Sequence, residues 1–342
     1  MIIKVEATIP CRLDKYLRRL YPKLTQGVIE RALRQKQIMV NGNKIEANLR
    51  IKEDDEIFIN DKLNLPQEET LEVIFSDSII TLANKLIKNY LIYENEHFIA
   101  INKPAGLATQ GGTKINLSID DALKYLNYKN SNGVKSAPFE YKAQGATPID
   151  NRRATSNDVG EWGSFDYKLV HRLDKETSGL LIIAKNYESS VKLADAFKEK
   201  LIAKTYIAVV FGRPPKNIGE IQGLIGKRKE GAYEIVDIDN ENGKLAITHY
   251  KLLKSLNNNL SLIEFTPITG RMHQLRFHAK LLNCPIVGDA KYGMAQPPLH
   301  PKHMLLHASN IVFHEKIFGE EITLKAKLPN YFLNILGSVN QI

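Results

Sequence analysis

The chain has 342 residues, of which 43% are hydrophobic, so it is long enough for two domains and a substantial core. Its net charge of +9 favours a polyanionic partner, although many basic proteins never touch nucleic acid. Its two cysteines, Cys11 and Cys284, exclude a disulfide framework and a multi-cysteine zinc site. We find no secretion signal and no run near the roughly 20 apolar residues that span a bilayer. We therefore expect a soluble, cytoplasmic protein without membrane contact.

Residues 1–62 are predicted to form a small α/β domain. Apolar residues recur at helical spacing over 13–20, and a second amphipathic stretch covers 26–35. Asn41-Gly42 lies between two short apolar runs, a pattern that predicts a β-hairpin. Another strand is expected over 50–59. The order of the elements is helix, helix and hairpin.

The two predicted helices are strongly basic. Between positions 15 and 36 there are seven basic residues and a single acidic one, Glu30. Such cations could contact phosphates and release counterions, which strengthens binding at low salt. The alternative is a solvated helix face. We predict RNA contacts from Lys15, Arg18, Arg19, Arg31 and Arg34.

Residues 63–88 are predicted to be a linker, because they carry Pro66, a Gln-Glu-Glu cluster and mixed polarity. The second domain, 89–342, then opens with a strand over 98–102 and the turn Lys103-Pro-Ala-Gly106.

A long polar stretch interrupts this second domain. After a helix expected over 118–126, residues 127–165 are rich in Asn, Ser, Gly, Pro and charge and lack apolar periodicity. We interpret 127–165 as an inserted mobile loop. A loop that contacts RNA is the alternative, motivated by Lys135, Lys142, Arg152 and Arg153.

The polar run 171–179, here named the signature loop, is followed by the apolar strand 180–184. A rigid sheet fixes a loop that it carries, which suits functional groups. Strands that follow one another with few crossover helices predict an α+β fold, a mostly antiparallel mixed sheet with flanking helices. The remaining predictions are helices over 189–201 and 271–282 and strands over 204–211, 220–225, 245–253 and 260–267.

The signature loop, His171-Arg-Leu-Asp-Lys-Glu-Thr-Ser-Gly179, resembles the signature of the pseudouridine synthases that modify ribosomal and transfer RNA without a guide RNA. Two further stretches agree, Lys103-Pro-Ala-Gly106 and Thr269-Gly-Arg-Met-His-Gln-Leu-Arg276, the latter followed by Pro285-Ile-Val-Gly-Asp289. Residues 1–62 resemble the S4 RNA-binding module. One departure is Met272, where the family commonly has Thr; it puts one hydrogen bond in doubt.

The resemblance implies an isomerase that converts specific uridines of large-subunit (23S-type) ribosomal RNA to pseudouridine. The reaction involves no redox change, so no cofactor is required. Asp174 would be the essential residue, either by attacking the sugar covalently or by stabilising positive charge and removing a ribose proton. Arg276 would keep it ionised. Tyr206 would lie beside the target uracil; a Tyr packed in the core is the alternative.

The resemblance also implies contacts with RNA. Arg172 matches the position whose guanidinium fills the space left by a flipped uridine. His171 could contact the RNA backbone, although its role stays open. The other RNA-binding candidates of the second domain are Lys103, Arg271, His273 and Gln274.

Two other functions are compatible with parts of the sequence. One is a catalytically silent RNA-binding factor for ribosome assembly on the same fold. The other is a metal hydrolase built on His300, His303 and His307, whose spacing suits one helix face. Pro301 disturbs that helix and no cysteine or acidic cluster completes a ligand set, so we expect no metal. We expect the protein to act as a monomer.

Overall fold

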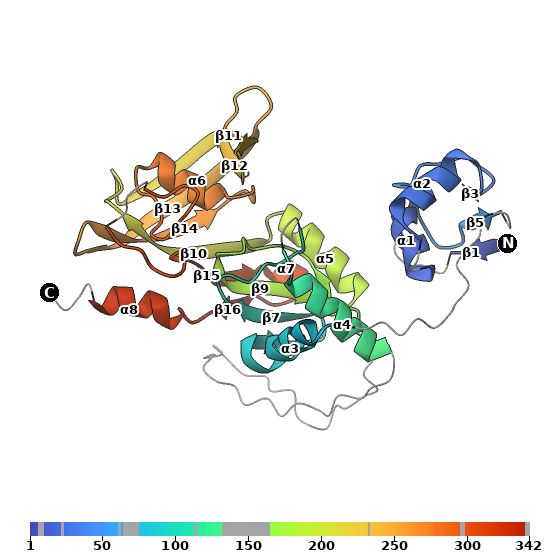
Figure 1. Cartoon of the computed structure of the whole chain (residues 1–342), viewed down its shortest axis with the longest axis horizontal. Helices are drawn as coiled ribbons and strands as arrows, with labels where there is room; N and C mark the ends of the chain where they lie inside the picture. Colours follow the sequence, from blue (N-terminus) through green and yellow to red (C-terminus); the bar gives the residue numbers. More distant parts are fainter. Residues whose placement is uncertain are drawn as a thin grey trace. The chain divides into compact units, whose positions relative to one another are not determined.

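The computed structural model describes residues 1–5, 10–21, 24–60, 63, 75–112, 115–131, 165–231, 233–294 and 298–338. The chain divides into two compact units, residues 1–74 and 75–342 (Figure 1). No helix among the described residues is long and apolar enough to cross a membrane.

The first unit contains the two predicted helices, and both are confirmed. Leu13 and Leu17 of the first helix are fully buried against Ile29 of the second, because their apolar residues recur on one face. The Thr25 side chain caps the second helix by accepting the Val28 N–H. The elements are α1 (Leu13–Leu20), α2 (Gln26–Arg34), β1 (Ile2–Lys4), β2 (Cys11–Arg12), β3 (Ile38–Val40), β4 (Arg50–Ile51) and β5 (Glu56–Ile59).

The predicted hairpin around Asn41-Gly42 is only partly right. Asn41 and Gly42 do turn the chain, with φ of +49° and +74°. However, β3 pairs in an antiparallel arrangement with β5. It does not pair with Lys44-Ile45, the second apolar run of the predicted hairpin, which follows the turn directly. The predicted strand 50–59 is two strands, because a turn closed by the Asp55 carboxylate on the Lys52 N–H separates β4 from β5.

The second unit is built on one mixed sheet, as predicted. Its strands follow the order β12-β11-β13-β14-β10-β15-β9-β7-β6, and β16 and β8 pair with β15 and β9. Every pair is antiparallel except β15 with β9. Its strands are β6 (Leu91–Glu94), β7 (Phe98–Lys103), β8 (Lys168–Leu169), β9 (Ser178–Ala184), β10 (Ile202–Phe211), β11 (Ile218–Glu230), β12 (Tyr233–Ile238), β13 (Lys244–Leu256), β14 (Leu260–Pro267), β15 (Leu306–Phe313) and β16 (Ile322–Lys325).

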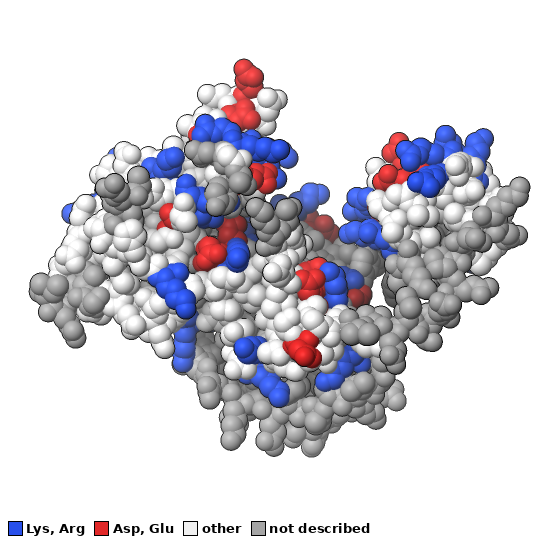
Figure 2. All heavy atoms as spheres, in the orientation of Figure 1, with Lys and Arg blue, Asp and Glu red and all other residues white. Residues whose placement is uncertain are grey.

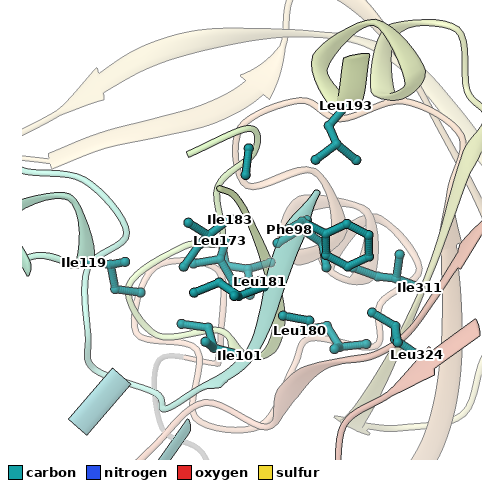
Figure 3. Close-up of a cluster of buried hydrophobic side chains, with 14 of the residues drawn as sticks. Phe98, Ile101, Ile119, Leu173, Leu180, Leu181, Ile183, Leu193, Ile311 and Leu324 are labelled. Atoms are coloured by element: carbon teal, nitrogen blue, oxygen red, sulfur yellow. The ribbon is translucent and has the colours of Figure 1, made fainter. Parts of the chain in front are cut away.

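Helices flank this sheet. They are α3 (Asp77–Lys85), the π-helical turn η1 (Leu86–Tyr90), α4 (Ile119–Ser131), α5 (Tyr187–Lys198), α6 (Gln274–Leu281), α7 (Glu315–Phe318) and α8 (Asn330–Ser338). The predicted buried strand after the signature loop is confirmed, since every residue of β9 is buried. Figure 3 shows Phe98 of β7 and Leu181 of β9 with Ile119 from α4 and Leu193 from α5. The signature loop therefore enters the most deeply buried strand of the sheet.

Two predicted boundaries are wrong. The linker 63–88 cannot extend beyond 74, because α3 and η1 bury Leu82, Ala83 and Leu86 in the core of the second unit. The insertion 127–165 begins too early, because α4 continues to Ser131. Residues 132–164, including Trp162 and the four cations named above, lie outside the described residues.

Candidate active site

The signature loop is clamped on both sides of Asp174. The Thr109 hydroxyl accepts the Leu173 N–H at 3.2 Å and donates to the Leu173 carbonyl at 2.8 Å. The Lys175 carbonyl accepts from Lys103 Nζ at 3.1 Å and from the Gly106 N–H at 2.8 Å. Both chain neighbours of Asp174 are thus fixed by the 103–109 segment, which limits the movement of its carboxylate.

Gly179 ends the loop at a position that only glycine fits. Its φ is +109°, and a Cβ there would collide with the backbone of Ala308 in the parallel neighbour β15. The absent side chain lets the loop pass directly beside β15.

The structure brings Asp174 and Arg276 together, as predicted. Arg276 Nη1 lies 3.5 Å from Asp174 Oδ2, and the two side chains are 6% and 21% exposed. On its other side, Arg276 donates to both carboxylate oxygens of Asp289, at 2.8 and 2.6 Å. This bidentate pair fixes the guanidinium in one orientation toward Asp174.

Asp289 is surrounded by groups that stabilise its negative charge next to Arg276. Burial alone would raise the pKa of Asp289, but hydrogen bonds from Arg276 and from the backbone N–H groups of Lys291 and Tyr292 lower it overall. Asp289 is therefore a carboxylate at neutral pH.

His273 lies beside the same carboxylate, that of Asp174. It sits at the N-terminus of α6 with a left-handed φ of +52°, and its Nε2 is 3.9 Å from Asp174 Oδ2. Its Nδ1 is 2.9 Å from the hydroxyl of Tyr292. Burial lowers the pKa of His273 to about 4, although Asp174 acts in the opposite direction, so the ring is neutral near pH 7.

Tyr206 lies on β10, where the pairing with β15 shifts register between Thr205 and Tyr206. The residue is half-buried and packs against apolar residues of the core. Burial, and then the charge of Asp174, raise the pKa of Tyr206. The phenol is therefore protonated at neutral pH and within electrostatic range of Asp174.

Three predicted RNA-binding residues belong to the scaffold instead. Lys103 is fully buried, and its ammonium donates to three backbone carbonyls, those of Pro104, Leu107 and Lys175. Gln274 is 3% exposed and ties the turn before α6 to β13 through the Ile247 carbonyl and Thr248. Neither side chain can reach RNA.

The third scaffold residue is His171. Its Nε2 accepts the Ile182 N–H at 2.8 Å, and its ring packs against Phe197. Burial, and then Lys204, lower the pKa of His171 to about 3, so it stays a neutral acceptor that holds the loop on β9. By contrast, Arg172 and Arg271 are exposed, and Arg271 Nε donates to the Leu245 carbonyl at 3.1 Å.

The histidines considered for a metal site do not share a helix. His307 is fully buried in β15, and its Nδ1 is 2.9 Å from Ser178 Oγ. Within the described ranges, no group of three His, Cys, Asp or Glu side chains could hold a metal ion.

A clamped carboxylate faced by a buried arginine, with a half-buried tyrosine of the same sheet within its electrostatic range, is the arrangement expected of the pseudouridine synthases. The comparison with family models agrees: the model described as RNA pseudouridylate synthase matches residues 97–281, and the S4 domain model matches residues 11–57. The chain therefore belongs to the RNA pseudouridylate synthase family, carries an S4 domain and is an isomerase.

Individual relatives span nearly the whole chain. This chain is 61% identical to the ribosomal large subunit pseudouridine synthase C of Rickettsia felis, over 97% of this chain and 98% of the relative. It is 32% identical to the protein of the same name from Buchnera aphidicola subsp. Baizongia pistaciae, over 96% of this chain and 93% of the relative. Human RNA pseudouridylate synthase domain containing 4 has a similar structure, with a TM-score of 0.56 and 26% identity over 77% of this chain and 97% of that one.

Proposed function

We propose that this protein isomerises specific uridines of large-subunit ribosomal RNA to pseudouridine. The observation that carries the chemistry is the Asp174 carboxylate, held between two clamped residues and 3.5 Å from Arg276. The choice of RNA is supported by the names of relatives that are 60% identical or more over 97% of the chain, both ribosomal large subunit pseudouridine synthases C. A ribosomal RNA substrate supports a cytoplasmic location, and we expect the protein to act there as a monomer.

The site suits each step of this chemistry. The bond between ribose C1′ and uracil N1 breaks, the base turns, and a bond forms from C1′ to C5. Asp174 acts ionised, either as a nucleophile at C1′ or as a stabiliser of positive charge that also removes a ribose proton. The guanidinium of Arg276, 3.5 Å from Asp174 Oδ2, supplies a positive charge next to that carboxylate. C5 loses its proton and N1 gains one, so no proton is lost overall. The phenol of Tyr206 can stack on the uracil and relay that proton, giving up its own as it receives the one from C5.

The rival is a catalytically silent RNA-binding factor. Pseudouridines are to be mapped in large-subunit RNA from cells with the wild-type gene, without it, and with an Asp174→Asn gene. We expect specific pseudouridines to disappear in both altered strains. Retention of every site without the gene would contradict the proposed substrate, and restoration of the sites by the Asp174→Asn gene would favour the silent factor.

Arg172 is an exposed cation two positions before Asp174, and we propose that it fills the gap left by the flipped uridine. Extruding a stacked base costs a few kcal/mol, and a linear RNA has less stacking to break. Arg172→Ala should therefore slow single-turnover isomerisation about 10- to 100-fold more on a stem-loop than on its linear counterpart.

Arg172→Lys is the matched variant for that experiment. It keeps the charge but lacks the planar face that stacks on bases, so it should rescue poorly. Equal losses on both RNAs, or full rescue by Lys, would indicate simple phosphate binding.

The S4 domain offers a basic surface for binding RNA. Lys15, Arg18, Arg31 and Arg34 are exposed on α1 and α2, whereas the side chain of Arg19 lies outside the described part. Figure 2 shows Lys and Arg side chains gathered on the visible face of this unit. Replacing the four exposed cations by Gln should weaken RNA binding and make its log–log salt slope shallower by up to about 3.

A control removes the same charge elsewhere. Four exposed lysines of the second unit, Lys198, Lys200, Lys216 and Lys316, are replaced by Gln. We expect this protein to keep a slope close to that of the wild type. Equal slopes for the two quadruple variants would mean that the helix cations do not contact phosphates.

A further inference from the structure

The hydrogen bonds around Tyr292 determine which nitrogen of His273 carries the proton. The Val236 N–H donates to the Tyr292 oxygen at 2.7 Å, and His273 Nδ1 lies 2.9 Å from the same oxygen. The phenol has one proton, and among the described residues His273 Nδ1 is the one acceptor within its reach. The buried hydroxyl is satisfied when it donates to Nδ1.

Donation to Nδ1 leaves the imidazole proton on Nε2. The ring is neutral near pH 7, as described above, so only one of its nitrogens carries hydrogen. Nε2 is the nitrogen that faces Asp174 Oδ2, at 3.9 Å. A hydrogen-bond donor therefore points from His273 toward the catalytic carboxylate.

Arg276 approaches the same carboxylate oxygen. Its Nη1 is 3.5 Å from Oδ2, and its guanidinium lies over the Tyr292 ring, 5.2 Å from the centroid. Within the described structure, Asp174 Oδ1 has neither a hydrogen-bond nor an ion-pair partner. Two donors thus converge on Oδ2, and Oδ1 is left for the substrate.

We propose that His273 is a positioning residue: Tyr292 fixes its Nε2–H tautomer, and this N–H holds Asp174 Oδ2 so that Oδ1 acts on the ribose. The inference rests on the proposed role of Asp174. A distance of 3.9 Å exceeds a hydrogen bond, but catalytic hydrogen bonds of free enzymes often shorten when substrate binds. A neutral donor also orients the carboxylate without a second cation, which would weaken it as a nucleophile or base.

The tautomer can be measured without any turnover. Long-range ¹H–¹⁵N spectra of the histidine-labelled protein distinguish Nε2–H from Nδ1–H rings, and His273→Gln identifies the signals of His273. We expect the Nε2–H form in the wild type and a substantial Nδ1–H population in Tyr292→Phe, which keeps the ring beneath Arg276 but lacks the hydroxyl. An Nδ1–H ring in the wild type would overturn the proposal even if the protein is a pseudouridine synthase.

Amide replacements test the positioning role. A Gln amide reaches the place of Nε2, whereas an Asn amide reaches only the place of Nδ1. In single-turnover assays we expect His273→Gln within about 10-fold of the wild type, and His273→Asn and His273→Ala slower by about 100-fold. RNA affinity should stay within a few-fold in all three.

His249→Gln is the matched control, because His249 is an exposed histidine on β13 that pairs with Glu220. It should keep the wild-type rate. Equal losses for Gln and Asn at position 273 would overturn the proposal. The series is run on whichever RNA the wild type converts, so failure of the ribosomal RNA assignment is seen separately, as absence of wild-type turnover on that RNA.

Discussion

Asp174→Asn should lower the rate of isomerisation on the order of 10⁴-fold or more, because the amide can neither attack the sugar nor balance positive charge on it. RNA affinity should remain within a few-fold of the wild type. The Asp174 side chain is only 21% exposed, and in nucleic-acid binding the phosphate contacts commonly supply most of the affinity. Single-turnover pseudouridine formation and a binding titration measure the two effects.

The control for this substitution is Asp195→Asn, an exposed carboxylate on α5. It should retain the full rate. Mass spectrometry of the Asp174→Asn protein is essential, because deamidation would restore the carboxylate. Turnover by a verified preparation near the wild-type rate would show that Asp174 is not the essential group.

Local patterns predicted the elements whose residues decide their own structure. The strand 260–267 was predicted with its observed bounds, because its apolar and aromatic residues form a short run between polar turns. The pairing of β3 with β5 was not predictable from Asn41-Gly42, since a tight turn fixes the local chain direction but not the distant partner. Likewise, Leu82 and Leu86 became core residues only through contacts with the sheet.

Motifs predicted which residues belong to the site, but they gave the wrong direction for some polar side chains. Asp174 and Arg276 come together as expected, and Tyr206 lies within electrostatic range of Asp174. Lys103 and Gln274, by contrast, turn inward to backbone carbonyls. A motif fixes residue types, whereas the direction of a polar side chain depends on tertiary packing.

Three supporting residues had no assigned role from the sequence. Pro285–Asp289 belongs to the family resemblance, yet nothing in the local sequence indicates that Asp289 holds Arg276, which lies 13 positions away. Thr109 and Tyr292 carried no sequence signal, because their partners are Leu173 and His273, far along the chain. Such contacts become visible only once the chain is folded.

Asp289→Ala should lower both stability and activity. It leaves the Arg276 guanidinium, 6% exposed, without its bidentate partner. Removing one member of a buried pair typically costs about 3–5 kcal/mol. Arg276 is then free to shift toward Asp174, so the rate should fall about 100-fold. Thermal unfolding and single-turnover assays measure the two losses.

Two further variants separate the loss of stability caused by an unpaired buried charge from the loss of catalytic activity. Glu234→Ala breaks the exposed pair with Lys227 and should cost less than about 1 kcal/mol. The double variant Asp289→Ala with Arg276→Met removes both buried charges, so it should recover much of the stability while remaining inactive. Recovery of activity by the double variant would contradict the role of Arg276 as the partner of Asp174.

The stability difference between wild type and Asp289→Ala should also depend on pH. The pKa of Asp289 is lowered in the folded protein, so its contribution is complete above the ordinary Asp pKa and is lost as the pH falls through the folded value. Unfolding measured from neutral to acidic pH should therefore show the gap between the two proteins narrowing in acid. A gap that stays constant would mean that the Asp289 side chain acts through its shape, and that the charge on Arg276 is balanced chiefly by Asp174.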